Sequence, residues 1–381
     1  MGEMIYLDNA ATTPVDPAVL AAMKPYFSEK YGNASSVHTS GLEAKRALEQ
    51  GRDIIARAIG AKGDEIIFTS GGTEANNFAI KGLFFANPDK KHIITTKIEH
   101  DCVMNACKWL ERQDVEVTYL DVDKEGFIDL EEFKKEITPD TLLVSVIHGN
   151  NEIGTIQPIG EIGKICRERG VLFHTDACQS FTKTDINVKK QNLDLVTLNA
   201  HKIHGPKGVG ALYVRKGIKI EPLQHGGGHE KGLRSGTENI PGIVGFAKAV
   251  KLAKSKHIKY MTKLRDKLIE GILKIDNTQL NGPKEKRLCN NINIKFNNIE
   301  GESIGGYLDA DEICSSTGSA CSSHTLEPSH VLAAIGLSPL EANSSIRLSL
   351  SRHNTEQEIE KVLAVLPKIV GKLRKISPFS K

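Results

Sequence analysis

One stretch decides the fold: Leu193-Asp194-Leu195-Val196-Thr197-Leu198-Asn199-Ala200-His201-Lys202. Its apolar first part, Leu193–Leu198, predicts a buried strand, and the glycine and proline residues of Ile203–Gly208 predict a turn directly after it. Because Lys202 stands between strand and turn, we expect its amine at the edge of the protein core. Such a lysine loses its charge readily when desolvated and can form a Schiff base. An isolated strand-end lysine is more often a solvated surface charge, so the rest of the chain has to decide.

Helical and strand patterns alternate on both sides of this stretch, from near residue 40 to residue 215. Apolar periodicity predicts helices over Leu42–Ile59, Thr73–Leu83 and Pro158–Glu168. Strands separated by helices predict an α/β fold, in which a mostly parallel seven-stranded sheet is flanked by helices and binds ligands beyond its carboxyl ends. The predicted strands are Glu65–Thr69, His92–Thr96, Val115–Leu120, Leu142–Ile147, Val171–His174, Leu193–Leu198 and Val209–Val214.

The pattern changes in the last third of the chain. Residues 241–276 predict one or two long helices, and a turn follows at Asn281-Gly282-Pro283. We expect a large domain over residues 16–255 and a smaller α+β domain built from residues 1–15 and 256–381. The elements predicted for the smaller domain are strand Asn291–Phe296, helix Glu302–Leu308, a short strand to Cys314, helix Ser329–Ile335, strand Ile346–Leu350 and helix Thr355–Arg374.

The composition argues against several classes of protein. The chain has 381 residues, a formal net charge of +3 and 39% hydrophobic residues. Lysine is spread along the chain without a basic block, so nucleic-acid binding is not predicted. No apolar run reaches the ~20 residues that span a bilayer, and the N-terminus lacks a signal-peptide pattern. We therefore expect a cytoplasmic protein that binds neither membranes nor nucleic acids.

The cysteine content predicts reduced thiols and no metal site. An odd number of cysteines without an export signal argues against a disulfide framework, and the absence of a Cys-x-x-Cys pair argues against structural zinc. The segment Asp121–Glu132 matches a calcium-loop template, but an expected strand precedes it where the template needs a helix, so we expect a solvated turn. The seven cysteines are Cys102, Cys107, Cys166, Cys178, Cys289, Cys314 and Cys321.

Three further features lie at the same predicted sheet edge as Lys202. Thr69–Asn77 places glycines and a hydroxyl at a helix N-terminus, which makes a phosphate cradle or an ordinary capped turn. Asp176 ends a strand, where a buried carboxylate needs a cationic partner such as a protonated pyridine nitrogen, Lys or Arg. His100 follows another strand and could equally be a capping residue. Phosphate cradle, Asp, His and Lys at one edge together predict a site for pyridoxal 5'-phosphate.

Over essentially its whole length the chain resembles the cysteine desulfurases of the NifS-like and IscS-like group, in class V of the fold-type I, aspartate-aminotransferase-like superfamily. The resemblance implies a homodimer that binds pyridoxal phosphate and acts on L-cysteine. The segments that carry it are Tyr6–Pro14, Gly32–His38, Ser70–Glu74, Asn150–Gly154, Asp176–Gln179, His201–Lys202, Gly226–Glu230, Arg234–Thr237, Ser319–Cys321 and Ser345–Arg347.

The resemblance assigns a role to each matching residue. Lys202 would hold the cofactor covalently, Asp176 would pair with its pyridine nitrogen, and His100 would stack on its ring. Arg347 and Asn33 would bind the substrate carboxylate, a role that suits a guanidinium. The remaining cofactor contacts would come from Asn151, from Gln179 near the phenolic oxygen, from Gly72, Thr73 and His201 at the phosphate, and from Thr237 of the other subunit.

Three positions depart from the family pattern. Asn199 stands where the family commonly has a serine that binds the phosphate; because asparagine can still donate a hydrogen bond, we keep Asn199 as a cofactor ligand. Ala34 stands where the family often has proline, and Gly72 where it often has alanine.

Cys321 decides which reaction is predicted. It lies in a small, polar segment over about residues 315–328, a composition typical of mobile loops, where exposed thiols are reactive. Composition alone leaves open a surface cysteine without a role, but the family motif Gly318-Ser319-Ala320-Cys321 indicates a nucleophile. The expected reaction converts L-cysteine to L-alanine and leaves the sulfur on Cys321 as a persulfide, with His100 handling protons.

The fate of the sulfur and the alternatives stay open at this point. The resemblance implies an iron–sulfur scaffold protein as the acceptor, for cluster assembly or other thio-cofactor synthesis, with tRNA thiolation enzymes as another option. Cys314, near the loop, is expected to pack rather than react, with a relay role left open. The competing interpretations are a selenocysteine lyase or an aminotransferase on the same fold, and a non-catalytic scaffold subunit.

Overall fold

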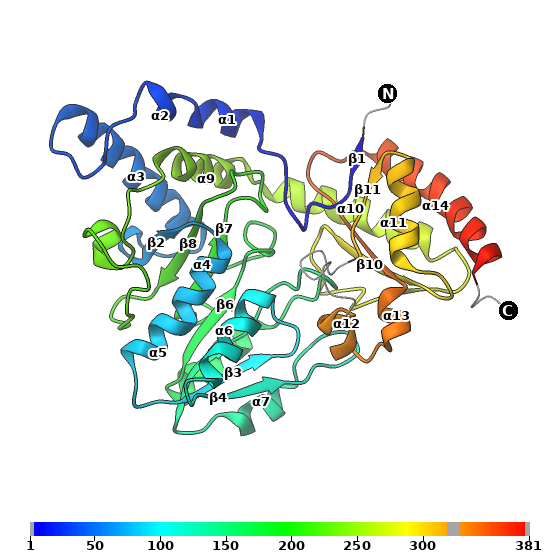
Figure 1. Cartoon of the computed structure of the whole chain (residues 1–381), viewed down its shortest axis with the longest axis horizontal. Coiled ribbons are helices and arrows are strands. Elements are labelled where there is room, and N and C mark those ends of the chain that lie inside the picture. Colours follow the sequence, from blue (N-terminus) through cyan, green and yellow to red (C-terminus); the bar gives the residue numbers. More distant parts are fainter. Residues whose placement is uncertain (1–3, 318–327, 378–381) are drawn as a thin grey trace.

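A computed structural model describes residues 4–317 and 328–377 of the chain. Cys321 therefore lies outside the described residues. Figure 1 shows two groups of elements, one around a large sheet and one around a smaller sheet near both termini. Among the described residues no helix combines the length and the apolar character needed to cross a membrane.

The large sheet has seven strands, as predicted. Neighbours from β4 through β3, β5 and β6 to β7 pair in parallel, whereas β8 pairs antiparallel with both β7 and β2. β8 is antiparallel because only the turn around Ile203–Gly208 joins it to β7, and a parallel crossover would need a helix there. The strand order is β2 (Ile66–Thr69), β8 (Gly210–Val214), β7 (Leu195–Asn199), β6 (Leu172–Asp176), β5 (Thr141–Ser145), β3 (His92–Thr96) and β4 (Glu116–Leu120).

Helices cover both faces of this sheet, so side chains on the two faces of a strand pack into different apolar clusters. On β2, Ile66 and Phe68 belong to one cluster and Ile67 to the other. The predicted helix at Thr73 runs in the structure from Gly72 to Ala86, with a π-helical turn in its middle. The helices of this group are α1 (Pro17–Met23), α2 (Pro25–Ser28), α3 (Thr39–Ala58), α4 (Gly72–Asn77), α5 (Leu83–Ala86), α6 (Asp101–Glu111), α7 (Leu130–Glu136), α8 (Ile159–Arg169) and α9 (Ile240–Leu252).

The second group is built around an antiparallel sheet with the order β12 (Ser345–Ser349), β10 (Asn291–Phe296), β9 (Thr278–Leu280). Its apolar cluster includes Ile5 and Leu7 from the N-terminal segment, and β1 (Ile5–Tyr6) pairs in parallel with β11 (Ile313–Cys314). Figure 1 shows this segment running from β1, beside the C-terminal elements, across to α1. The helices are α10 (Ser255–Ile272), α11 (Gly301–Ala310), α12 (His330–Ala334), α13 (Pro339–Asn343) and α14 (Glu356–Ile376). The domain boundaries given above stay a prediction.

Candidate active site

A cavity of about 580 Å³ lies at the carboxyl ends of the central strands of the large sheet. Its lining joins residues that follow β3, β5, β6 and β7 to the N-terminal segment and to β12. Parallel strands put their carboxyl ends on one edge, which is why residues so far apart in sequence meet there. The predicted site residues that line it are Gly72, Thr73, His100, Asn151, Asp176, Gln179, Asn199, His201, Lys202 and Arg347.

Lys202 enters the cavity wall from the turn after β7. The turn is held by backbone bonds from the N–H groups of Ile203 and Gly205 to the carbonyl of Ala200. The Lys202 amine donates to the carbonyl oxygens of Ala10 and Ala11, the latter at 2.5 Å. The N-terminal segment is thereby tied to the end of β7, and the amine is kept at the cavity.

Asp176 ends β6 and is almost fully buried, with 4% of its surface exposed. Its carboxylate accepts a hydrogen bond from Asn76 Nδ2 at 2.6 Å and one from the Cys178 backbone N–H at 2.8 Å. Both donors are neutral, so they orient the carboxylate without neutralising it. A buried carboxylate at a cavity wall is suited to a cationic partner such as a protonated ring nitrogen. The sequence analysis did not assign Asn76 to the site. The signal that could have indicated it is an asparagine on the helix that follows the glycine run.

The predicted phosphate cradle lies where β2 turns into α4. Gly72 fits tightly, because an added Cβ would lie 2.6 Å from Cys178 Sγ. An alanine at this position would therefore crowd the Cys178 thiol. Asn199 is buried and its Oδ1 has no hydrogen-bond partner among the described residues; a 180° rotation of the amide, which exchanges O and N, turns this unpaired position into a donor suited to a phosphate oxygen. Burial, aided by nearby lysines, lowers the pKa of His201 to about 4, so its ring is neutral at neutral pH.

His100 caps the N-terminus of α6. Its Nδ1 accepts a hydrogen bond from the Cys102 backbone N–H at 3.2 Å, which leaves the proton of the neutral ring on Nε2. The preceding residue, Glu99, also lines the cavity and is fully buried. Its Oε1 accepts from the Ile147 N–H at 2.7 Å and the Thr96 hydroxyl at 2.9 Å. Burial, despite these bonds, raises the pKa of the Glu99 carboxyl to about 8.

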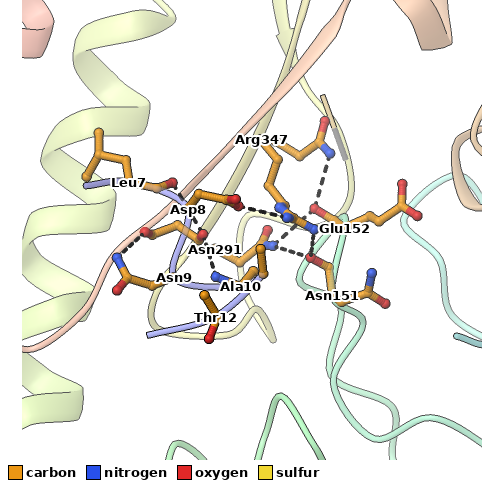
Figure 2. A network of polar contacts seen from close by, with 12 residues as sticks. Leu7, Asp8, Asn9, Ala10, Thr12, Asn151, Glu152, Asn291 and Arg347 are labelled. Carbon is orange, nitrogen blue, oxygen red and sulfur yellow. Dashed lines mark hydrogen bonds and ion pairs between the residues drawn. The ribbon is translucent and has the colours of Figure 1, made fainter. Parts of the chain in front are cut away.

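Arg347 on β12 forms the opposite wall, where Figure 2 shows it among residues of the N-terminal segment and residues 151–152. Its Nη2 atom lies 3.0 Å from an oxygen of Asp8, and its Nη1 atom donates to the Asn151 carbonyl at 3.1 Å. Asn291 Nδ2 donates to the carbonyls of Asn151 and Glu152 at 3.3 and 3.0 Å and fixes that segment in turn. The Arg347 Nε is buried without a partner among the described residues. Asp8 is a further polar residue that the prediction did not assign.

Two of the predicted residues that the structure describes are not part of this lining. Asn33 and Thr237 are exposed and lie outside the cavity of their own chain. Cys321 lies outside the described residues. The chain on either side of residues 318–327 nevertheless adjoins the cavity: Ser316 exchanges backbone hydrogen bonds with Arg347 at 3.1 and 2.6 Å, and Pro328 and His330 line the wall.

The residues present fit pyridoxal phosphate. The cavity offers an amine, a buried carboxylate held by neutral donors, a glycine turn at a helix start, and the buried Asn199 amide and Arg347 Nε, both with unused hydrogen-bonding capacity. Metal binding has no comparable support, since within residues 4–317 and 328–377 no three His, Cys, Asp or Glu side chains are grouped to hold an ion.

Comparison with known proteins gives a consistent result. The aminotransferase class-V family model matches residues 5–362. Cysteine desulfurase IscS of Methanosarcina thermophila is 53% identical over 380 residues, covering 99% of this chain and 94% of that protein. The protein of the same name from Dictyoglomus turgidum is 52% identical over 385 residues, covering 100% and 98%.

Solved structures agree. A NifS-like protein superposes with a TM-score of 0.92 at 40% identity and covers 97% of this chain and 100% of its own. SspA in complex with cysteine superposes with a TM-score of 0.84 at 41% identity and covers 92% and 100%. The chain therefore belongs to the aminotransferase class-V family, among its cysteine desulfurases.

Proposed function

We propose that the protein removes sulfur from L-cysteine, releases L-alanine and carries the sulfur on Cys321 as a persulfide. The observation that carries this proposal is the meeting of an amine, a carboxylate and a guanidinium in one cavity, from Lys202, Asp176 and Arg347. These groups match the needs of an amino-acid substrate: a covalent anchor for the cofactor, a counter-charge for its ring and a partner for the substrate carboxylate.

Pyridoxal 5'-phosphate would be held by Lys202, by Asp176, by the Asn199 and Gln179 amides, and by the turn at Gly72 and Thr73. When bound, it supplies an electron sink for the α-carbon of an amino acid. His100 would lie against its ring. Asp176 would face the ring nitrogen, with its carboxylate oriented by two neutral donors, Asn76 Nδ2 and the Cys178 N–H.

Substrate binding, proton transfer and sulfur transfer are carried out by the protein's own side chains. Arg347 binds the carboxylate of cysteine and orients its α-carbon toward Lys202. The Lys202 amine removes the α-proton and, as the ammonium that results, returns it to the substrate; His100 presents its Nε2–H to the reacting groups as a hydrogen-bond donor. Cys321, as a thiolate, attacks the substrate sulfur; an S–S bond forms as the C–S bond breaks. The electron pair of that C–S bond stays with the carbon, which takes a proton and leaves as L-alanine.

We propose in addition that the protein works as a homodimer. Asn33 and Thr237 are exposed and lie outside the cavity of their own chain, so they can serve a site only if another copy approaches. Large exposed apolar side chains also occur in the N-terminal region that contains Asn33, at Leu20 (57% exposed), Phe27 (64%) and Tyr31 (76%). Exposed apolar surface of this kind favours an interface. Sedimentation should give twice the chain mass, and Phe27→Glu should lower it to that of the single chain.

For the sulfur acceptor we propose an iron–sulfur scaffold protein, which is the partner that the family resemblance implies. Transfer of labelled sulfur from cysteine, through Cys321, to a purified scaffold protein is the measurement that checks it. The cytoplasmic location stays a prediction.

Product analysis tests the reaction itself. With L-cysteine and a reducing thiol, the protein should release L-alanine and sulfide in equal amounts, and Cys321→Ser should stop sulfide release while retaining the cofactor. Cys314→Ser is the matched control and should remain active. Formation of mercaptopyruvate from cysteine, together with the amino acid that corresponds to an added keto acid, would identify an aminotransferase instead. A kcat/KM for selenocysteine far above that for cysteine would identify a selenocysteine lyase.

A further inference from the structure

The segment between β8 and α9 has an irregular backbone that its neighbours must hold. Over residues 223–237 the only regular element is the short turn of helix His229–Gly232. Within it, Glu230 and Lys231 have φ angles of 46° and 61°. Residues other than glycine rarely adopt this left-handed conformation, and they keep it only where surrounding contacts enforce it. Lys231 Nζ donates to the Asp64 carbonyl at 2.7 Å, and two ion pairs hold the segment in addition.

The first ion pair joins this segment to the edge of the large sheet. Glu230 is buried, and both of its oxygens accept from the Arg52 guanidinium on α3, each at 2.7 Å. The same carboxylate accepts from the backbone N–H of Phe68 at 2.7 Å, and Arg52 donates to the carbonyl of Ile66 at 2.9 Å. Phe68 and Ile66 belong to β2, an edge strand. The pair thus supplies the hydrogen bonds that a further strand would give to β2.

The second ion pair joins the segment to the phosphate cradle. Glu74 lies in the first turn of α4. Arg234 Nε lies 2.8 Å from its Oε1, and Arg234 Nη2 lies 3.2 Å from its Oε2. The Glu74 carboxylate also accepts from the Ser70 backbone N–H at 2.7 Å. Ser70 and Glu74 flank Gly71, Gly72 and Thr73. Both ion pairs therefore fix the chain immediately before and after the cradle, although none of their four side chains lines the cavity as the described residues define it.

We propose that Arg52, Glu230, Arg234 and Glu74 form a clasp that positions the cofactor-phosphate site. The clasp holds β2 and the start of α4 so that the backbone N–H groups of the cradle point at the phosphate. It also holds the loop that carries Thr237, so that a second copy meets this residue in a fixed position. These are positioning residues, since they act through the cradle and through Thr237. The inference rests on the proposed cofactor.

The test uses the complete cofactor-loaded protein and compares two arginine variants. Arg234→Met removes the cradle-side ion pair, which is partly exposed (21% and 24%) and so leaves the core intact. Arg215→Met is the control, because Arg215 forms a comparable ion pair with Asp194 elsewhere on the large sheet. We measure the rate of cofactor loss on dilution and the phosphorus NMR signal of the bound cofactor. Arg234→Met should release the cofactor roughly tenfold faster and shift the signal.

The double variant Arg52→Met/Glu230→Met is a second test of the clasp. Both residues are replaced together because an apolar replacement of a buried ion pair leaves no uncompensated charge. It should also speed cofactor loss, since the edge of β2 loses its partners. Unchanged release and an unchanged phosphorus signal in Arg234→Met and in this double variant would overturn the proposal. Unchanged release in Thr237→Val alone would overturn only the part that concerns the second copy. A wild-type protein that shows no bound-cofactor phosphorus signal would overturn the proposed function itself.

Discussion

The two walls of the cavity are held by different kinds of contact. On the sheet wall, Asp176 and His100 are oriented by neutral donors: the backbone N–H groups of Cys178 and Cys102, each two positions away, and Asn76 Nδ2, which lies 100 positions from Asp176. On the opposite wall, Arg347 is held by a charged partner, Asp8, that lies 339 positions away. The sheet wall is therefore organised by uncharged hydrogen-bond partners at the strand ends, together with the N-terminal carbonyls that hold Lys202, whereas the opposite wall depends on an ion pair between the N-terminal segment and β12. One wall is suited to a resident cofactor, and the other to a substrate that comes and goes.

The largest expected effect comes from removing the amine of the sheet wall. Lys202→Ala should lower desulfuration by at least roughly a thousandfold and abolish the visible absorption of the bound cofactor. Lys207→Ala, which changes an exposed lysine of the same turn, is the control and should leave both unchanged. A Lys202→Ala protein that turns over cysteine at the wild-type rate would remove the sheet wall from the chemistry.

The matching change on the opposite wall should affect substrate binding rather than cofactor binding. Arg347→Ala should raise KM for cysteine by roughly a hundredfold, because it removes the partner of the substrate carboxylate from a buried position. Asp8→Asn is the control: it keeps the side-chain shape beside Arg347, and we expect a much smaller change. Steady-state kinetics measure both, and cofactor loss in Arg347→Ala with an unchanged KM would contradict the division between the walls.

The sequence pattern predicts the residues of the sheet wall better than those of the opposite wall. Lys202, Asp176 and His100 could be located because each follows a strand, and strand ends share one edge of a parallel sheet. The pairing of Arg347 with Asp8 leaves no local pattern, so Arg347 was assigned from the family resemblance alone. Asn76, Glu99 and Glu230 were missed for a related reason: their importance lies in burial and in long-range partners. The strand β9 was missed because three partly exposed residues, Thr278–Leu280, carry too short a pattern.

A smaller effect is expected from the fit between the cradle and Cys178, which follows β6. Gly72→Ala should weaken cofactor binding by roughly tenfold, since the new methyl group would lie 2.6 Å from Cys178 Sγ and displace the cradle or the thiol. Gly72→Ala/Cys178→Ala should restore most of the affinity, because it removes the sulfur that the methyl group meets. Equal affinities for the single and the double variant, measured by cofactor titration, would show that this contact does not set the cradle.

The last expected effect is on stability rather than on turnover, and it concerns Glu99, a buried acid of the sheet wall. The pKa of Glu99 is raised by burial to about 8, above the 4.5 of an ordinary glutamate. Between these two pH values the folded state binds more protons than the unfolded state, so stability falls as pH rises, by up to about 1.4 kcal/mol per pH unit. The amide of the Glu99→Gln variant does not ionise, so this contribution to the pH dependence of stability is absent from the variant. In urea unfolding at pH 5 and pH 9, the variant should gain stability relative to the wild type at the higher pH. A constant difference would mean that Glu99 ionises normally.

The most direct test of the central claim is to locate the sulfur after one turnover. The cofactor-loaded protein is mixed with L-cysteine, quenched without reductant, digested and analysed by mass spectrometry. We expect the mass of one added sulfur atom on the peptide that contains Cys321, and on none of the peptides that contain the other six cysteines. Added sulfur on Cys102 or Cys178, or alanine formed with no added sulfur on Cys321, would contradict the account.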